Sequence, residues 1–137
     1  MESPADNLEQ VVKGLKYDAA GLIPAVIVDA RTKQVLMVAY MNEQSLLATL
    51  RTGRTHFWSR SRKKHWMKGE ESGHVQPVKA VYTDCDMDTV VIEAEQTGAA
   101  CHDGYFSCFY RRLSAAGQWE VAAPKVFDPA SVYKKAK

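Results

Sequence analysis

The sequence lacks long hydrophobic runs, and it does not begin with the basic and then apolar segments of a secretory signal. Its longest apolar stretch, around residues 25–28, falls far short of the roughly 20 apolar residues that span a bilayer. We therefore expect a cytoplasmic protein that has no membrane partner.

The composition also lacks the bias of a disordered or fibrous chain. Hydrophobic residues make up 46% of it, charged residues make up 25%, and there are only 8 Gly and 5 Pro. A chain of 137 residues is the length of one domain, which buries about two thirds of its unfolded surface. We expect residues 1–137 to form a single domain.

Cysteine is scarce, with three in the chain. Three thiols cannot all pair within one molecule, and the cytosol disfavours disulfides. The cysteines therefore point to thiolate chemistry or to metal binding.

Positive charge is concentrated in one segment. Residues 51–68 contain seven of the 18 Lys and Arg residues and no acid, which leaves 11 for the rest of the chain against all 16 acidic residues. This distribution indicates a local anion site and not a generally basic protein.

The apolar pattern predicts an α+β fold dominated by strands, with a mostly antiparallel sheet and short helices. Asn42 is suited to cap a short amphipathic helix, and Gly53 is suited to end it. A polar N-terminal arm and a Lys-rich tail at 134–137 are expected to fray. The predicted strands are 24–29 and 35–40, which form a hairpin, followed by 55–60, 78–84, 89–95 and 107–113.

Residues 84–88 read Asp-Cys-Asp-Met-Asp. If this segment is extended, Asp84, Asp86 and Asp88 share one face and Cys85 points away from them. Three adjacent carboxylates repel one another unless a cation binds, and Mg²⁺ prefers such oxygen ligands. The alternative is an exposed acidic turn without a metal.

Cys101 and Cys108 could converge on one soft metal ion if the chain loops over Gly104. A catalytic zinc ion usually has three protein ligands and a water, and the chain has three thiols. The alternative is that these are buried structural cysteines.

Residues 56–74 combine aromatic, basic and Gly-containing polar stretches, which suits phosphate and base recognition. The alternative is a solvated basic hairpin whose tryptophans pack in the core. Among the histidines, His56 and His65 are explained as structural, whereas His74 and His102 are candidate acids or bases.

Four motifs together resemble the phosphoribosyl-AMP cyclohydrolase family of histidine biosynthesis. The resemblance covers about residues 21–112 and extends upstream of the motifs through 21–25 and 35–42. The motifs are FWSRSR at 57–62, W-x-K-G-E-x-S-G-H at 66–74, D-C-D-x-D at 84–88, and A-C-H at 100–102 followed by S-C-F-Y-R at 107–111.

The resemblance implies one zinc ion per subunit and a magnesium ion, in a monofunctional homodimer with intertwined subunits and active sites at the interface. It implies zinc ligands Cys85, Cys101 and Cys108, with Cys85 from the partner chain, and magnesium ligands Asp84, Asp86 and Asp88. Residues 103–106 depart from the family pattern, which has a hydroxyl residue at 103 and a basic residue at 105 or 106.

The implied reaction adds water to C6 of the adenine ring of phosphoribosyl-AMP and breaks the N1–C6 bond. His102 or His74 is the expected base. The expected substrate-binding residues are Trp58, Arg60, Arg62, Lys68 and Ser72. The rival interpretation is a zinc-containing module that binds single-stranded nucleic acid. A zinc nucleoside deaminase is disfavoured because its His-x-Glu and Pro-Cys-x-x-Cys signatures are missing.

Overall fold

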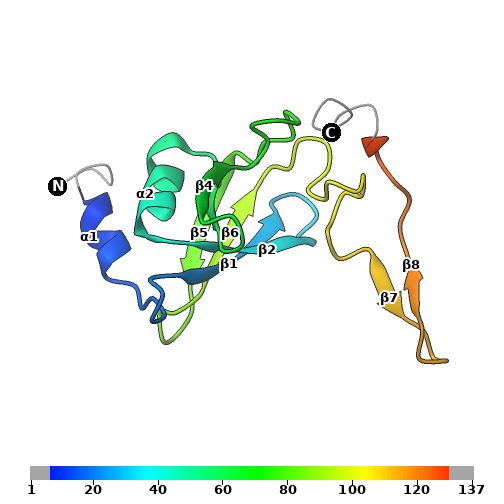
Figure 1. Cartoon of the computed structure of the whole chain (residues 1–137), viewed down its shortest axis with the longest axis horizontal. Helices are drawn as coiled ribbons and strands as arrows, with labels where there is room; N and C mark the ends of the chain where they lie inside the picture. Colours follow the sequence, from blue (N-terminus) through cyan, green and yellow to red (C-terminus); the bar gives the residue numbers. More distant parts are fainter. Residues whose placement is uncertain (1–6, 130–137) are drawn as a thin grey trace.

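The computed structural model describes residues 7–129 and shows an α+β fold with one six-stranded sheet and a separate two-stranded ribbon (Figure 1). The large sheet has the order β4-β3-β2-β1-β6-β5, and only the β1–β6 pair is parallel. The predicted strand-dominated, mostly antiparallel class is confirmed. The elements are α1 (Leu8–Lys13), β1 (Ile23–Asp29), β2 (Val35–Met41), α2 (Glu43–Thr52), β3 (His56–Ser59), β4 (Lys64–Met67), β5 (Val78–Thr83), β6 (Val90–Ala94), β7 (Arg111–Leu113) and β8 (Trp119–Val121).

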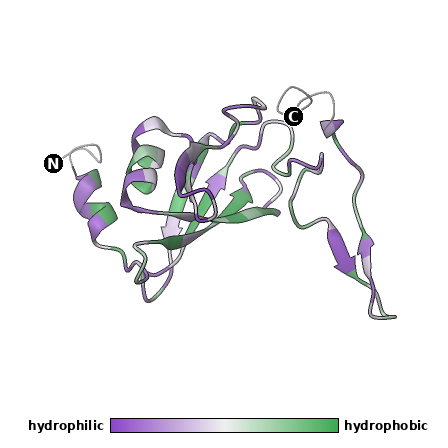
Figure 2. Ribbon diagram, viewed as in Figure 1, coloured by the Kyte–Doolittle hydropathy of each residue, from purple (hydrophilic) through white to green (hydrophobic). Residues whose placement is uncertain are grey.

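The core is built around β1, in which buried and half-buried residues alternate. This period of two follows from the pleat, which turns successive side chains to opposite faces. Ile23, Ala25 and Ile27 are fully buried, and Leu46 of α2 and Phe57 of β3 pack with them. In Figure 2 the middle of the large sheet is accordingly mostly green. The central strand thus fixes the positions of both halves of the sheet.

The predicted helix cap at Asn42 is confirmed. The Asn42 side-chain oxygen accepts a hydrogen bond from the Ser45 backbone N–H at 2.8 Å, and the Ser45 hydroxyl accepts one from the Asn42 N–H at 2.9 Å. Such a cap contributes about 1 kcal/mol. Gly53 ends the helix with φ of 73°, in the left-handed region that glycine adopts most easily.

The N-terminal arm contains a helix that the sequence reading missed. Within residues 7–129, α1 packs through Val12, which is 2% exposed, and the Tyr17 hydroxyl donates to the Val12 carbonyl at 2.7 Å. The tail at 134–137 lies outside the described residues. Neither α1 nor α2, the helices of the described range, has the length and apolarity to cross a membrane.

The predicted strand at 107–113 is wrong for its first four residues, because only Arg111–Leu113 is a strand. The residues before Arg111 are held on β2 by individual hydrogen bonds and not by strand pairing. The Cys108 N–H donates to the Leu36 carbonyl at 2.7 Å, and the Ser107 hydroxyl donates to the Val35 carbonyl at 2.7 Å. These bonds take the place of strand pairing and hold the loop at the start of β2.

Candidate active site and metal-binding residues

The acidic turn, residues 84–88, connects β5 to β6. The expectation of an extended segment here is wrong, because β5 ends at Thr83 and the chain turns at once, with Met87 at φ of 62°. The Met87 N–H donates to the Asp84 carbonyl at 3.1 Å, and the Asp88 N–H donates to the Asp84 side chain at 3.1 Å. The turn, and not strand alternation, gathers the carboxylates.

The three carboxyl groups of the acidic turn can each offer one oxygen within 4.8 Å of the others, and all three are exposed. A hydrogen bond with Asp86, followed by burial and the charge of Asp84, raises the pKa of Asp88. Burial acts to raise the pKa of Asp84, but hydrogen bonds from Asp88 outweigh it and lower that pKa. Carboxylates this close repel one another when all are ionised, and a divalent cation would relieve that repulsion. The donor set fits a hard ion such as Mg²⁺.

Cys101 and Cys108 face each other across a loop that turns at Gly104, as their spacing predicts. The Gly104 N–H donates to the Cys101 carbonyl at 3.1 Å, and a side chain at Gly104 would meet the Phe127 carbonyl at 2.5 Å. Cys108 is exposed as a residue, yet burial around its sulfur and the neighbouring Cys101 raise its pKa to about 11. A soft cation would favour deprotonation of both thiols, so the pair fits part of a zinc site.

Lys68 lies beside this pair of thiols. It is only 8% exposed, and its ammonium donates to the carbonyl of Ala100. Burial lowers the pKa of Lys68, and the charges of Cys108 and Cys101 oppose that shift. Its cation therefore lies where it partly balances negative charge on sulfur.

The acidic turn, which contains Cys85, precedes β6, and the loop that contains Cys101 follows it, so the two segments lie at opposite ends of that strand. The strand between them has five residues, or about 16 Å of extended chain. Among residues 7–129, the only group of three or more potential ligands within 4.8 Å of one another is that of the acidic turn, so one chain does not bring its three sulfurs together. Within one chain, Cys85 therefore lies apart from the cysteine pair.

A cleft of about 500 Å³ joins four of the residues expected at the site, which come from separate segments. It is lined by β4 and the 69–72 loop, together with Arg62 and His102. Lys68 and Ser72 contribute to the same wall. The His102 ring is 81% exposed, and its Nε2 lies 3.5 Å from a carboxyl oxygen of Asp103. A neighbouring carboxylate can orient the ring.

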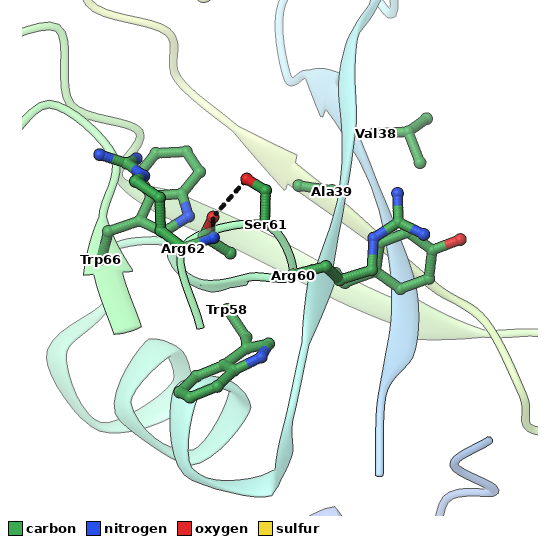
Figure 3. A pocket seen from close by; sticks show the side chains of 9 residues that line it. Val38, Ala39, Trp58, Arg60, Ser61, Arg62 and Trp66 are labelled. Carbon is green, nitrogen blue, oxygen red and sulfur yellow. Dashed lines mark hydrogen bonds between the residues drawn. The ribbon is translucent and has the colours of Figure 1, made fainter. Parts of the chain in front are cut away.

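A second hollow, of about 570 Å³, contains the other two expected substrate residues, Trp58 and Arg60. Figure 3 shows Arg60 and Arg62 pointing to opposite sides of it. The Arg60 guanidinium lies 4.0 Å from the centre of the Tyr40 ring. Sequence reasoning missed this contact, which depends on the pairing of Tyr40 with Trp58 between β2 and β3. Arg62 and Trp66 line both hollows, so the two spaces adjoin.

The structure does not bring His74 into either hollow. Its Nδ1 accepts a hydrogen bond from the Ala99 N–H at 3.4 Å, and its ring meets Phe127 edge-on at 4.7 Å. A side chain at Gly98 would collide with the ring, with atoms at 2.6 Å. The His74 ring is therefore packed between two loops. Its role in proton transfer stays a prediction.

His56 and His65 bond to each other, with Nδ1 of the first 2.9 Å from Nε2 of the second. Burial lowers the pKa of His56, and the neighbouring His65 lowers it further. Their mutual contact on β3 and β4 agrees with the structural role that the sequence suggests.

Comparison with known proteins decides the family. The profile described as phosphoribosyl-AMP cyclohydrolase matches residues 37–110. The chain belongs to the phosphoribosyl-AMP cyclohydrolase family. It is 58% identical over 121 residues to a phosphoribosyl-AMP cyclohydrolase of Pelotomaculum thermopropionicum, which covers 88% of this chain and 94% of the relative. A protein of the same name from Methanosarcina acetivorans is 56% identical, with 87% of this chain and 95% of the relative covered.

The histidine biosynthesis bifunctional protein HisIE of Thermoanaerobacter pseudethanolicus is 47% identical over 127 residues, which are 93% of this chain and 58% of that relative. The cyclohydrolase profile extends from β2 to Tyr110. Both hollows, the acidic turn and the cysteine pair therefore fall almost wholly within the part of the chain that defines the family. Family membership makes the chain a hydrolase.

Proposed function

We propose that this chain hydrolyses the N1–C6 bond of the adenine ring of 1-(5-phosphoribosyl)-AMP in histidine biosynthesis. The product is the ring-opened phosphoribosyl-formimino aminoimidazole carboxamide ribotide. One observation carries the proposal. In a member of the cyclohydrolase family, Arg62, Lys68, Ser72 and His102 line a single cleft, and Lys68 ties that cleft to the cysteine pair.

The two adjoining hollows support a substrate that carries two phosphates. Arg60 and Arg62 point apart, so each can hold one phosphate with the planar fork of its guanidinium. Trp66 lies at the junction and packs on buried Phe57, with ring centres 4.9 Å apart. Its indole offers a fixed surface on which the base can stack, and Trp58 offers a second. Ser72, on the 69–72 loop, adds a hydroxyl.

Two metal ions per subunit complete the proposal. Cys101 and Cys108 of one chain and the partner subunit's Cys85 hold zinc, which supplies Lewis acidity and lowers the pKa of water at the site. Mg²⁺ is held by Asp84, Asp86 and Asp88. The site is thus shared between the subunits of a homodimer.

His102 is the proposed general base. Three thiolates leave the zinc site negatively charged overall, which weakens the acidification of water and makes a base useful. His102 takes a proton from the water that adds to C6 and returns a proton to N1 as the C6–N1 bond breaks. Asp103 orients its ring. His74 is the second candidate, although it lines neither hollow.

The test is to supply phosphoribosyl-AMP with Zn²⁺ and Mg²⁺ and to follow the ultraviolet change on ring opening. His102→Gln should lower kcat by about 10²-fold or more, which is the usual contribution of a general base. His74→Gln, the matched control, should lower the Tm and leave kcat nearly unchanged. No turnover by the wild-type protein would refute the proposed reaction, and salt-sensitive binding of single-stranded oligonucleotides would then favour the nucleic-acid module.

A further inference from the structure

The arm, residues 111–121, projects from the body of the molecule (Figure 1). It consists of β7 and β8, whose residues are all exposed, and these strands pair with each other and not with the large sheet. An isolated two-stranded hairpin has little stability of its own in water. The arm therefore needs either support at its base or a surface to rest on.

The base of the arm is fixed beside the cysteine pair. The rings of Tyr105 and Tyr110 stack with centres 3.6 Å apart and planes inclined by 7°, and the Arg111 guanidinium lies 4.5 Å from the centre of the Tyr110 ring. The Ala122 N–H donates to the Tyr110 carbonyl at 2.8 Å. The arm thus leaves the body in a set direction, starting at the residue that follows Tyr110.

The arm combines uncovered apolar side chains with positive charge. Leu113 is 54% exposed, Trp119 is 68% exposed and Val121 is 58% exposed. Figure 2 shows β7 in purple, which reflects Arg111 and Arg112. Within residues 7–129 no ion pair involves Arg112. Neighbouring apolar side chains with so much free surface are typical of an interface.

The acidic turn has complementary properties at the far end of the sheet. Its three carboxylates are exposed, and each can offer an oxygen within 4.8 Å of the others. Large apolar residues are also exposed there, with Met87 at 40% and Tyr82, on the adjoining β5, at 54%. β5 is an edge strand, so nothing within the sheet covers its outer side.

We propose that the arm of each subunit docks on the acidic turn of a second copy of this chain, with Arg112 placed beside the turn, which keeps one net negative charge when its three carboxylates hold Mg²⁺. The inference rests on the proposed function in one respect, the sharing of the zinc site. If the partner subunit's Cys85 joins Cys101 and Cys108, its acidic turn must come beside Cys108. Arg112 is four residues further on, at most about 14 Å of extended chain. Two-fold symmetry then repeats the contact between arm and acidic turn for the other subunit.

A charge exchange tests this pairing. Arg112→Glu and Asp88→Lys should each raise the dimer dissociation constant by about ten-fold or more, as expected when like charges meet at an interface. In a mixed dimer one contact pairs Glu with Lys and the other is the native Arg–Asp pair, so both contacts are attractive. With one variant labelled with ¹⁵N, native mass spectrometry should show heterodimers well above the statistical half.

Arg51→Glu is the matched control, because it reverses an exposed cation on α2, far from the arm. It should leave dimerisation unchanged, and the effect of Arg112→Glu should shrink at about 1 M salt, where the Debye length is about 3 Å. Wild-type dimerisation of the Arg112→Glu protein, or a heterodimer fraction at or below one half, would overturn the pairing. Association is measured without substrate, so this result is separate from any failure of the proposed reaction.

Discussion

The buried ammonium of Lys68 donates a hydrogen bond to the carbonyl of Ala100, the residue before Cys101. This bond joins the wall of the cleft to the cysteine pair, so a change in one is transmitted to the other. It also places the Lys68 cation beside two sulfurs. Burial lowers the pKa of Lys68, and the charges of the sulfurs oppose that shift.

Lys68→Met keeps the length of the side chain and removes its charge and its donors. Loss of the bond to a buried carbonyl should lower the free energy of unfolding by about 1–3 kcal/mol. The protein should also retain less zinc after dialysis, because the thiolates lose a compensating charge. Urea titration and atomic absorption measure the two effects. Lys64→Met, on the exposed face of β4, is the control, and equal zinc content in both variants would contradict this role.

Arg62→Ala should raise KM by about ten-fold or more, because a hydrogen bond to a charged group contributes about 1.5–3 kcal/mol. Its circular dichroism should not change, since Arg62 is exposed. Steady-state kinetics with phosphoribosyl-AMP give the measurement, with Arg51→Ala on α2 as the control. Wild-type KM in the Arg62 variant would indicate that the basic segment is a solvated surface and does not bind the substrate.

Inactive variants should complement each other if the zinc site is shared. Cys85→Ser and Cys101→Ser dimers each lack one ligand in both sites, whereas a mixed dimer has one intact site. Random reassortment makes half of the dimers mixed, so mild unfolding and refolding together with zinc should restore roughly a quarter of wild-type activity. If recovery is absent at every mixing ratio, the three thiols belong to one chain.

Gly98→Ala should be more damaging than Gly53→Ala, although both glycines have positive φ. At Gly53 nothing lies within 4 Å of the added carbon, so only the left-handed backbone is penalised, by about 1–2 kcal/mol. At Gly98 the same carbon also collides with the His74 ring. Thermal unfolding should give a clearly lower Tm for Gly98→Ala. Equal Tm values would show that His74 moves aside freely.

Asp29 should make stability depend on pH in the acid range. Burial raises its pKa, but hydrogen bonds from Thr32 and Gln96 outweigh burial and hold the pKa below the ordinary value of 3.8. Because the folded-state pKa is the lower one, this stabilisation is present above the ordinary pKa and is lost as pH falls through the folded value.

Asp29→Asn should therefore lower the urea midpoint less at acid pH than near neutrality. Between about pH 5 and about pH 2 the midpoint of the wild type should fall more steeply than that of the variant. Glu71→Gln, an exposed carboxyl, serves as the control. Parallel curves for wild type and Asp29→Asn would contradict the prediction.

Local signals made part of the fold predictable. Asn42 and Gly53 mark the ends of α2 by their own chemistry, and the β-branched run of β1 marks a buried strand. In contrast, β4 was missed because Lys64–Met67 carries no regular apolar alternation, and its strand conformation depends on pairing with β3. The acidic turn was misread because alternating letters resemble a strand, while only the pairing of β5 with β6 shows where the strand ends.

The candidate site also has a part that could be predicted from the sequence and a part that could not. The approach of Cys101 to Cys108 was predictable, since Gly104 allows a short loop to close. The positions of Lys68 and His74 were not, because each depends on a partner far along the chain, the Ala100 carbonyl and the Ala99 N–H. Contacts of this kind leave no periodic trace in the sequence.

The parallel pairing of β1 with β6 has a consequence for the growing chain. Residue 25 pairs with residue 90, whereas β2 follows β1 almost at once and pairs in a hairpin. During synthesis the second edge of an apolar strand therefore stays open until β6 has left the ribosome. Such long-range pairing slows folding, and open edges invite association with other chains. A nascent chain that stalls between β2 and β6 should thus depend on chaperones far more than the finished chain does.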